Sequence, residues 1–236
     1  MTPASPLHFY AFEVDLREFD RWSGMRDIHD RDLATHSLLA ELFGEGAPRP
    51  YRLVTVRDAP RGTLYGYGPR PVDDLRGTAE TLGAPDQLAA LPVDRMRGKP
   101  MPMVPGGTRV SVETRVRPVR RNGSRELDVF IADGRTESRE AAYARWWADT
   151  CARSGLDLDH DTIRLVAFSL VPFSAKRRRG KRPIGPDAVL RGVGKVTDAD
   201  SFHSLIARGV GRHRAYGYGA LLLSPARSAA NDGAAP

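Results

Sequence analysis

The stretch from Gly209 to Gly219, Gly-Val-Gly-Arg-His-Arg-Ala-Tyr-Gly-Tyr-Gly, carries the strongest chemical signal in the chain, and we call it the glycine-rich loop. Glycines interleaved with Arg212 and Arg214 supply backbone amides and guanidinium groups, which together bind phosphate. Tyr216 and Tyr218 add aromatic rings on which RNA bases can stack. A tight turn from a helix into a strand, with Gly209 only ending the helix, has the same composition.

A second candidate is the basic segment, residues 176–182, which holds six positive charges in seven residues. Charge this dense binds phosphate backbones by releasing counterions. A solvated, self-repelling loop would have the same sequence. The cations concerned are Lys176, Arg177, Arg178, Arg179, Lys181 and Arg182.

Residues for metal or nucleophilic chemistry are sparse. His29 and His36 fall on one helical face, but seven residues separate them by about 10 Å, which is too far for one metal ion. No acidic cluster has metal-ligand spacing, and no sequence resembles a nucleophile elbow. Cys151 is the single cysteine, so no internal disulfide can form. The sequence therefore predicts metal-free chemistry without a cofactor.

The charge balance favours a polyanionic partner. The 236 residues include 36 basic and 29 acidic side chains, a net charge of +7. Residues 1–100 hold 13 basic and 15 acidic residues, whereas residues 101–236 hold 23 and 14. This asymmetry points to nucleic acid, although an arginine-rich composition also arises from a GC-rich genome. With no apolar membrane-length run and no signal-peptide pattern at the start, we expect a cytoplasmic protein.

Hydrophobic periodicity and capping residues predict the elements that must position these side chains. In the first half we expect strands at 8–16 and 51–57, a helix at 30–43 and a short helix at 73–82. The rest of 60–107 is too rich in glycine and proline to assign. In the second half we expect strands at 108–119, 163–173, 188–196 and 215–223, and helices at 138–153 and 198–209.

The second half thus has the order βαββαβ of a ferredoxin-like unit, and the first half fits the same order loosely. We predict an α+β protein with two tandem ferredoxin-like domains and a C-terminal glycine-rich loop. The expected bounds are 7–105 for the N-terminal domain, which carries the His36 helix, and 106–225 for the C-terminal RNA-binding domain. Residues 226–236 are too poor in apolar side chains to pack and are expected to form a disordered tail.

Two segments resemble the CRISPR-associated repeat-RNA endoribonucleases of the CasE (Cse3) type, in the RAMP superfamily. Residues 189–225, VLRGVGKVTDADSFHSLIARGVGRHRAYGYGALLLSP, look like the last strand, helix, glycine-rich loop and strand of that family. Residues 32–43, DLATHSLLAELF, look like its first helix, where a histidine precedes a phenylalanine by seven residues. The resemblance implies tandem ferredoxin-like domains, in agreement with the pattern of elements.

The resemblance also implies a reaction: metal-independent cleavage of CRISPR precursor RNA at the base of the repeat hairpin. The RNA 2′-hydroxyl would attack the adjacent phosphate, giving a 2′,3′-cyclic phosphate and a 5′-hydroxyl, and the protein would keep its product bound. His36 corresponds to the catalytic histidine, since imidazole exchanges protons near neutral pH. Relatives often carry a tyrosine three residues earlier, where this chain has Leu33, so His29 or Arg31 is expected to provide catalytic support.

The expected partners are the CRISPR repeat RNA hairpin and other subunits of a CRISPR effector complex, with no membrane involved. Two alternatives remain open at this point: a non-catalytic RNA-binding subunit of such a complex, and a general basic RNA- or ribosome-associated module. The expected RNA-binding residues are the six cations of the basic segment together with Gly209, Gly211, Arg212, Arg214 and Tyr216.

Overall fold

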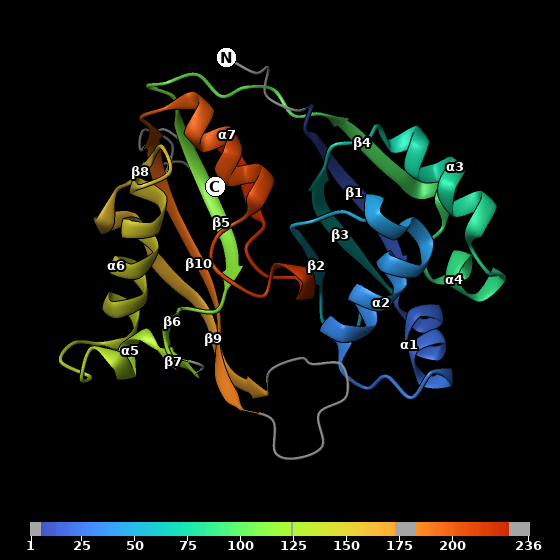
Figure 1. Cartoon of the computed structure of the whole chain (residues 1–236), viewed down its shortest axis with the longest axis horizontal. Helices are drawn as coiled ribbons and strands as arrows, with labels where there is room; N and C mark the ends of the chain where they lie inside the picture. Colours follow the sequence, from blue (N-terminus) through green and yellow to red (C-terminus); the bar gives the residue numbers. More distant parts are fainter. Residues whose placement is uncertain (1–5, 124, 173–182, 227–236) are drawn as a thin grey trace, which may run out of the picture.

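The computed structural model describes residues 6–123, 125–172 and 183–226. The basic segment and residues 227–236, most of the predicted tail, lie outside the described residues. Figure 1 shows two sheets side by side, one from each half of the chain, with helices packed on them. In the described ranges, no helix is long and apolar enough to span a membrane.

The N-terminal half forms a four-stranded antiparallel sheet in the order β2-β3-β1-β4. Its apolar face, which includes Tyr10, Phe12 and Val14 of β1, packs against buried side chains of the helices. The order of strands and helices is that of a ferredoxin-like unit. The elements are β1 (His8–Asp15), α1 (Leu16–Met25), α2 (Arg31–Phe43), η1 (Gly44–Gly46), β2 (Tyr51–Thr55), β3 (Arg61–Gly68), α3 (Val72–Leu82), α4 (Pro85–Ala90), η2 (Val93–Arg95) and β4 (Met96–Pro100).

The C-terminal half repeats the arrangement, with strand order β11-β5-β10-β8 and with β9 also paired to β10. Trp147 of α6 and Phe202 of α7 are fully buried in its core. A separate hairpin, β6-β7, follows β5. The elements are β5 (Arg109–Val116), β6 (Val119–Asn122), β7 (Arg125–Asp128), α5 (Val129–Ala132), α6 (Arg139–Ala152), β8 (Leu156–Leu158), η3 (His160–Thr162), β9 (Arg164–Pro172), β10 (Ile184–Val196), α7 (Ala199–Arg208), η4 (Arg214–Tyr216) and β11 (Leu221–Pro225).

The predicted tandem ferredoxin-like fold is confirmed, and three details of the sequence prediction are wrong. Residues 16–25, for which the sequence predicts no helix, form helix α1, whose N-cap is Asp15. The last strand begins at Leu221 and not at Ala215, because Gly217 and Gly219 have positive φ angles of 80° and 82° that interrupt extended backbone. The β6-β7 hairpin is absent from the prediction altogether.

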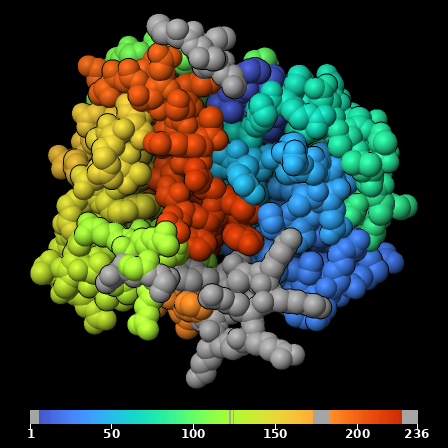
Figure 2. Space-filling model, viewed as in Figure 1, coloured from blue at the N-terminus to red at the C-terminus, as the bar shows by residue number. Residues whose placement is uncertain are grey.

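The two halves meet through side chains of the N-terminal sheet. The hydroxyl of Tyr67 donates a 2.5 Å hydrogen bond to the carbonyl oxygen of Leu221, and Tyr51 donates one of 2.8 Å to that of Ala215. Tyr67 itself belongs to the core of the C-terminal half. In the space-filling view the C-terminal segment lies against the N-terminal half along this junction (Figure 2). The two tyrosines therefore hold the second half of the glycine-rich loop and the start of β11.

Candidate nucleic-acid cleavage site

Helix α2 carries His36 to the junction between the halves. The helix begins at Asp30, whose carboxylate accepts a hydrogen bond from the backbone N–H of Leu33 at 3.0 Å. Leu38, Leu39 and Leu42 anchor the helix in the N-terminal core. His36 itself is half-buried, so its imidazole is neither sealed in the core nor freely solvated.

The imidazole of His36 meets the glycine-rich loop directly. Its ring centroid lies 5.1 Å from that of Tyr216, with the two planes tilted by 60°. His36 and Tyr216, which lie in the two segments that carry the family resemblance, are 180 residues apart in the chain, and the fold brings their rings together. A base stacked near Tyr216 would therefore place its sugar and phosphate within reach of His36.

The glycine-rich loop holds its shape through backbone contacts that require glycine. Val210 and Gly219 close it, the N–H of Val210 donating to the carbonyl of Gly219 at 2.9 Å. A Cβ atom on Gly219 would come within 2.3 Å of the Val210 oxygen, and Gly219 has a φ of +82°. The N–H of Gly219 donates to the carbonyl of Arg115 on β5 at 2.7 Å. The loop is thus fixed to the C-terminal sheet and presents Arg212, Arg214 and Tyr216 outward.

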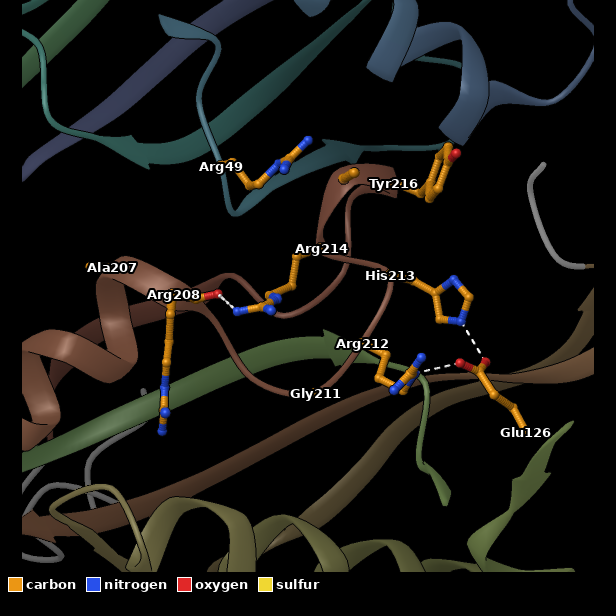
Figure 3. Close-up of a pocket in the computed structure, with 10 residues that line it drawn as sticks. Arg49, Glu126, Ala207, Arg208, Gly211, Arg212, His213, Arg214 and Tyr216 are labelled. Atoms are coloured by element: carbon orange, nitrogen blue, oxygen red, sulfur yellow. Dashed lines mark hydrogen bonds and ion pairs between the residues drawn. The ribbon is translucent and has the colours of Figure 1, made fainter. Parts of the chain in front are cut away.

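Two cavities flank the His36–Tyr216 pair. The first, of about 340 Å³, we call the His36 cavity; it is lined by α2 and by the chain leading into β2. The second, of about 560 Å³, we call the arginine cavity (Figure 3). It is lined by Arg49, Glu126, Ala207, Arg208, Gly211, Arg212, His213, Arg214, Ala215 and Tyr216.

The arginine cavity is strongly cationic. Four arginines and one glutamate line it, so its formal charge is about +3 with His213 neutral. Glu126 accepts hydrogen bonds from Arg212 and interacts with His213 Nε2 at 2.6 Å. Burial raises the pKa of Glu126, but the hydrogen bonds and positive charge of His213 and Arg212 lower it by more. The pKa of Glu126 is therefore below its usual value. The cavity therefore presents an ordered set of cations suited to a phosphate chain.

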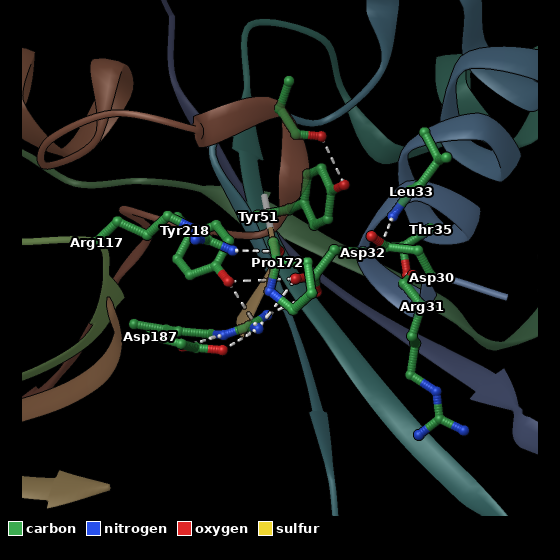
Figure 4. A network of polar contacts seen from close by, with 12 residues as sticks. Asp30, Arg31, Asp32, Leu33, Thr35, Tyr51, Arg117, Pro172, Asp187 and Tyr218 are labelled. Carbon is green, nitrogen blue, oxygen red and sulfur yellow. Dashed lines mark hydrogen bonds and ion pairs between the residues drawn. The ribbon is translucent and has the colours of Figure 1, made fainter. Parts of the chain in front are cut away.

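A buried charge cluster, made of Asp32, Arg115, Asp187 and Tyr218, locks α2 to the C-terminal sheet (Figure 4). Arg115 on β5 bonds Asp32 of α2 at 2.7 Å and Asp187 of β10 at 2.6 Å. The hydroxyl of Tyr218 accepts from Arg115 at 3.1 Å and lies 3.3 Å from Asp32. Burial lowers the pKa of Arg115, yet its bonds to the two carboxylates raise it more, so the guanidinium stays charged. Since Asp32 precedes His36 by one helical turn, the cluster also fixes the position of the imidazole.

His29 and Arg31, the sequence candidates for catalytic support, line neither of the two cavities. His29 lies 2.9 Å from Asp27 on the surface, and Arg31 pairs with Asp20 at 3.1 Å. Both line a third hollow together with Asp32, and Arg31 also lines a fourth. The structure brings together five of the predicted site residues, and these are His36, Gly211, Arg212, Arg214 and Tyr216.

Arginines recur among the alternate positions from Arg109 to Arg117, in and just after strand β5, but two of them are used in packing. Arg117, just after β5, is only 1% exposed, and its guanidinium lies 4.7 Å from the centroid of the Tyr218 ring. Arg115 is committed to its two carboxylates. Both arginines therefore stabilise the packing around Tyr218. Tyr218 is itself only 1% exposed, so the prediction that it stacks on an RNA base is wrong.

Comparison with known protein families identifies the family of this chain. Residues 7–225 match the family described as CRISPR associated protein. The chain belongs to this family. A search of curated proteins found no significant match.

The CRISPR-associated fold is equally clear from solved structures. The chain is similar to the CRISPR endoribonuclease Cse3 bound to 19 nt RNA, with a TM-score of 0.69 and 17% identity over 93% of this chain and 100% of that one. Thermus thermophilus Cse3, bound to an RNA representing a pre-cleavage complex, gives a TM-score of 0.68 at 16% identity with the same coverage. Cas6e from Escherichia coli str. K-12 gives 0.54 at 16% identity, again with the same coverage. The resemblance identified from the sequence is thereby confirmed.

Two residues of the site in this CRISPR-associated protein escape sequence reasoning. Glu126 lies on the unpredicted β6-β7 hairpin and reaches the arginine cavity only through the tertiary fold. Arg49 lies in the connection before β2, where its single signal is a position between Pro48 and Pro50. Among the described residues, no group of three or more His, Cys, Asp or Glu side chains is arranged to hold a metal ion.

Proposed function

We propose that this CRISPR-associated protein is an endoribonuclease that cleaves CRISPR precursor RNA at the base of the repeat hairpin. The RNA 2′-hydroxyl attacks the adjacent phosphorus while the 5′-oxygen leaves, which gives a 2′,3′-cyclic phosphate and a 5′-hydroxyl. The observation that carries the proposal is the contact of His36 with Tyr216, at the edge of the arginine cavity. It unites a group that transfers protons, a ring that stacks on bases and cations that bind phosphates.

The RNA supplies its own nucleophile in this reaction, so the protein has two tasks. It must move protons at the attacking and leaving oxygens, and it must stabilise the charge that builds up on the phosphoryl group. His36 serves the first task, since imidazole is a proton donor or acceptor close to neutral pH. The arginines around the glycine-rich loop bind the RNA strand and hold its scissile phosphate next to the imidazole.

Recognition of the RNA is proposed to rest on the cations. A-form RNA has a narrow major groove, so a hairpin is recognised by shape, phosphates and a few exposed base edges. The arginine cavity would hold the strand beside the cleavage point. The basic segment is proposed to bind the stem or its base, and this role stays a prediction. Similarity to chains of CRISPR RNA-guided surveillance complexes, at TM-scores of 0.55 and 0.57, supports a further proposal that the protein keeps its RNA within an effector complex.

A test of the proposal measures cleavage of hairpin repeat RNA in EDTA. We expect the native protein to cleave at one site and to leave a 2′,3′-cyclic phosphate. His36→Ala should lower the single-turnover rate by about 10²–10⁴-fold, with RNA affinity largely retained. His160→Ala, at an exposed histidine of η3 remote from both cavities, serves as the matched control and should cleave normally. Full activity of His36→Ala, or complete loss of activity in EDTA, would refute the mechanism.

One observation favours a second candidate, a non-catalytic RNA-binding subunit of an effector complex. Leu33 stands where relatives often carry tyrosine, and leucine can neither transfer a proton nor bond a phosphate. The same experiment separates the two functions. A non-catalytic subunit would bind the hairpin with native affinity and leave it intact.

A further inference from the structure

Arg49 connects the two cavities that flank the His36–Tyr216 pair. It lines the His36 cavity together with His36 and Tyr51, and it also lines the arginine cavity opposite Arg208 and Arg214. Of the described residues, Arg49 alone lines both. Figure 3 shows it on the N-terminal side of the arginine cavity, facing the arginines of the C-terminal half.

The backbone at Arg49 is held firmly although its side chain is exposed. Its N–H donates to the carbonyl of Tyr67 on β3 at 2.8 Å, and the N–H of Tyr67 donates back to the carbonyl of Pro50 at 3.0 Å. Pro50 is buried, and a Cβ atom on Gly209 would come within 2.9 Å of its ring. The attachment point of the guanidinium is thus fixed against the glycine-rich loop, while its tip is free to reach a ligand.

The positive charge of Arg49 is also not neutralised by an acidic side chain in the described ranges. The other arginines of the arginine cavity have partners: Arg212 bonds Glu126, Arg208 bonds the hydroxyl of Ser154, and Arg214 bonds the carbonyl oxygen of Arg208. The Arg49 side chain forms no ion pair or hydrogen bond with any residue in the described ranges, although Glu45 lines the same His36 cavity. An arginine without an acidic partner, beside a candidate catalytic imidazole, is available for a phosphate.

We infer that Arg49 is a further catalytic residue, whose guanidinium donates hydrogen bonds to the non-bridging oxygens of the scissile phosphate. This inference rests on the proposed function. As the 2′-oxygen attacks, negative charge grows on those oxygens before the bond to the 5′-oxygen breaks. A planar guanidinium matches two of them at once. A preorganised donor aimed at developing charge is worth about 10²–10³-fold in rate. Arg49 thereby supplies charge stabilisation that Leu33 cannot.

The test uses single-turnover cleavage at saturating protein, so that binding and chemistry are measured apart. Arg49→Ala should lower the cleavage rate by about 10²-fold with a much smaller loss of RNA affinity, since one phosphate contact among several is removed. Arg49→Lys should give an intermediate rate, because an ammonium keeps the charge but not the two-pronged geometry. Arg57→Ala, at a fully exposed turn residue remote from both cavities, is the matched control and should behave as the native protein.

A sulfur substitution distinguishes direct contact from an effect on folding. The experiment measures how fast the native protein and Arg49→Ala cleave RNAs in which sulfur replaces one or the other non-bridging oxygen of the scissile phosphate. Sulfur is a weaker acceptor, so it should slow the native protein at the oxygen that Arg49 contacts, and this penalty should shrink in Arg49→Ala. A variant that is only misfolded would lower all rates equally and keep the ratio.

The outcomes separate the two proposals. A native cleavage rate in Arg49→Ala, or an unchanged sulfur-to-oxygen ratio, would overturn the role of Arg49 while leaving the endoribonuclease intact. Failure of the native protein to cleave hairpin repeat RNA would refute the proposed function, and with it a catalytic role for Arg49.

Discussion

Arg115 has the most constrained side chain at the junction of the two halves. It is about one-fifth exposed and contacts carboxylates from two different elements, Asp32 of α2 and Asp187 of β10. The ring of Tyr218 lies 4.3 Å from its guanidinium carbon. A charged group in such surroundings stabilises the fold only while all its partners are present, because an unpaired buried charge is costly.

Replacing Arg115 by alanine should therefore destabilise the protein strongly. The change leaves two carboxylates close together without a cation, and we expect a loss of about 3 kcal/mol in the free energy of unfolding, measured by urea denaturation. Arg191→Ala is the control, because its pair with Glu113 is more exposed and should contribute about 0–1 kcal/mol. Equal losses in the two variants would show that the cluster is no stronger than a surface ion pair.

Residue types identified Arg212, Arg214 and Tyr216 as site candidates and the family resemblance identified His36, but neither could show which other arginines are available. Alternation along 109–117 predicts a basic face, yet the structure places Arg115 and Arg117 in packing roles. Whether an arginine is neutralised depends on acids that lie far away in the chain, as Asp32 does for Arg115. Charge counts from sequence cannot contain that information, which explains why Arg49 was missed.

At the scale of elements, the glycine-rich loop is the feature whose shape depends most on single residues. Gly107 and Gly219 share a similar φ, +87° and +82°, but only Gly219 is crowded by another backbone segment. An alanine at either position costs about 1–2 kcal/mol for the left-handed conformation. At Gly219 the added Cβ atom would also force Val210 away and open the loop.

Gly219→Ala should consequently lower both stability and RNA affinity, whereas Gly107→Ala should lower stability alone. Thermal denaturation and RNA binding by fluorescence anisotropy measure the two effects on the same samples. Native RNA affinity in a folded Gly219→Ala variant would contradict the assignment of the loop to RNA binding.

Elements with caps and a clear apolar period were predictable from sequence. Ser138 and Asp198 cap α6 and α7 as expected, with bonds to Ala141 and Ser201, and Gly209 ends α7. Helix α1 was missed because only Leu16, Phe19 and Trp22 mark its buried face, which is a short apolar repeat. Strands β3 and β4 lie in glycine- and proline-rich sequence with low strand propensity. Their hydrogen bonds to β1 stabilise the extended conformation that the local sequence does not favour.

At the scale of the whole molecule, tyrosines join the halves and make the junction sensitive to alkali. Burial raises the pKa of Tyr67 and of Tyr51 well above the usual tyrosine value of about 10. Burial also raises the pKa of Tyr218, and the neighbouring Asp32 adds to this. A tyrosine whose pKa is higher in the folded state stabilises the fold fully below the unfolded pKa. That contribution is lost as pH rises from about 10 toward the folded value.

We therefore expect the free energy of unfolding to fall steeply above about pH 10. Tyr67→Phe should be less stable than the native protein near neutral pH, because it lacks the bond to Leu221. It should also lose less stability between about pH 8 and about pH 11, since one shifted group is gone. Urea denaturation across this range measures both slopes, and parallel curves would contradict the role assigned to Tyr67.

The acceptors for Tyr51 and Tyr67 are main-chain carbonyls, at Ala215 and Leu221. Every amino acid carries such an oxygen, so only the donors, the hydroxyl groups of Tyr51 and Tyr67, need a particular residue type. These two hydrogen bonds therefore do not depend on the side chains at positions 215 and 221, whereas both phenols are required. A glycine-rich loop taken from a distant homologue should therefore fold correctly in this protein if its length and its glycines are kept. New RNA specificities could then be introduced without changing the N-terminal half, which carries His36.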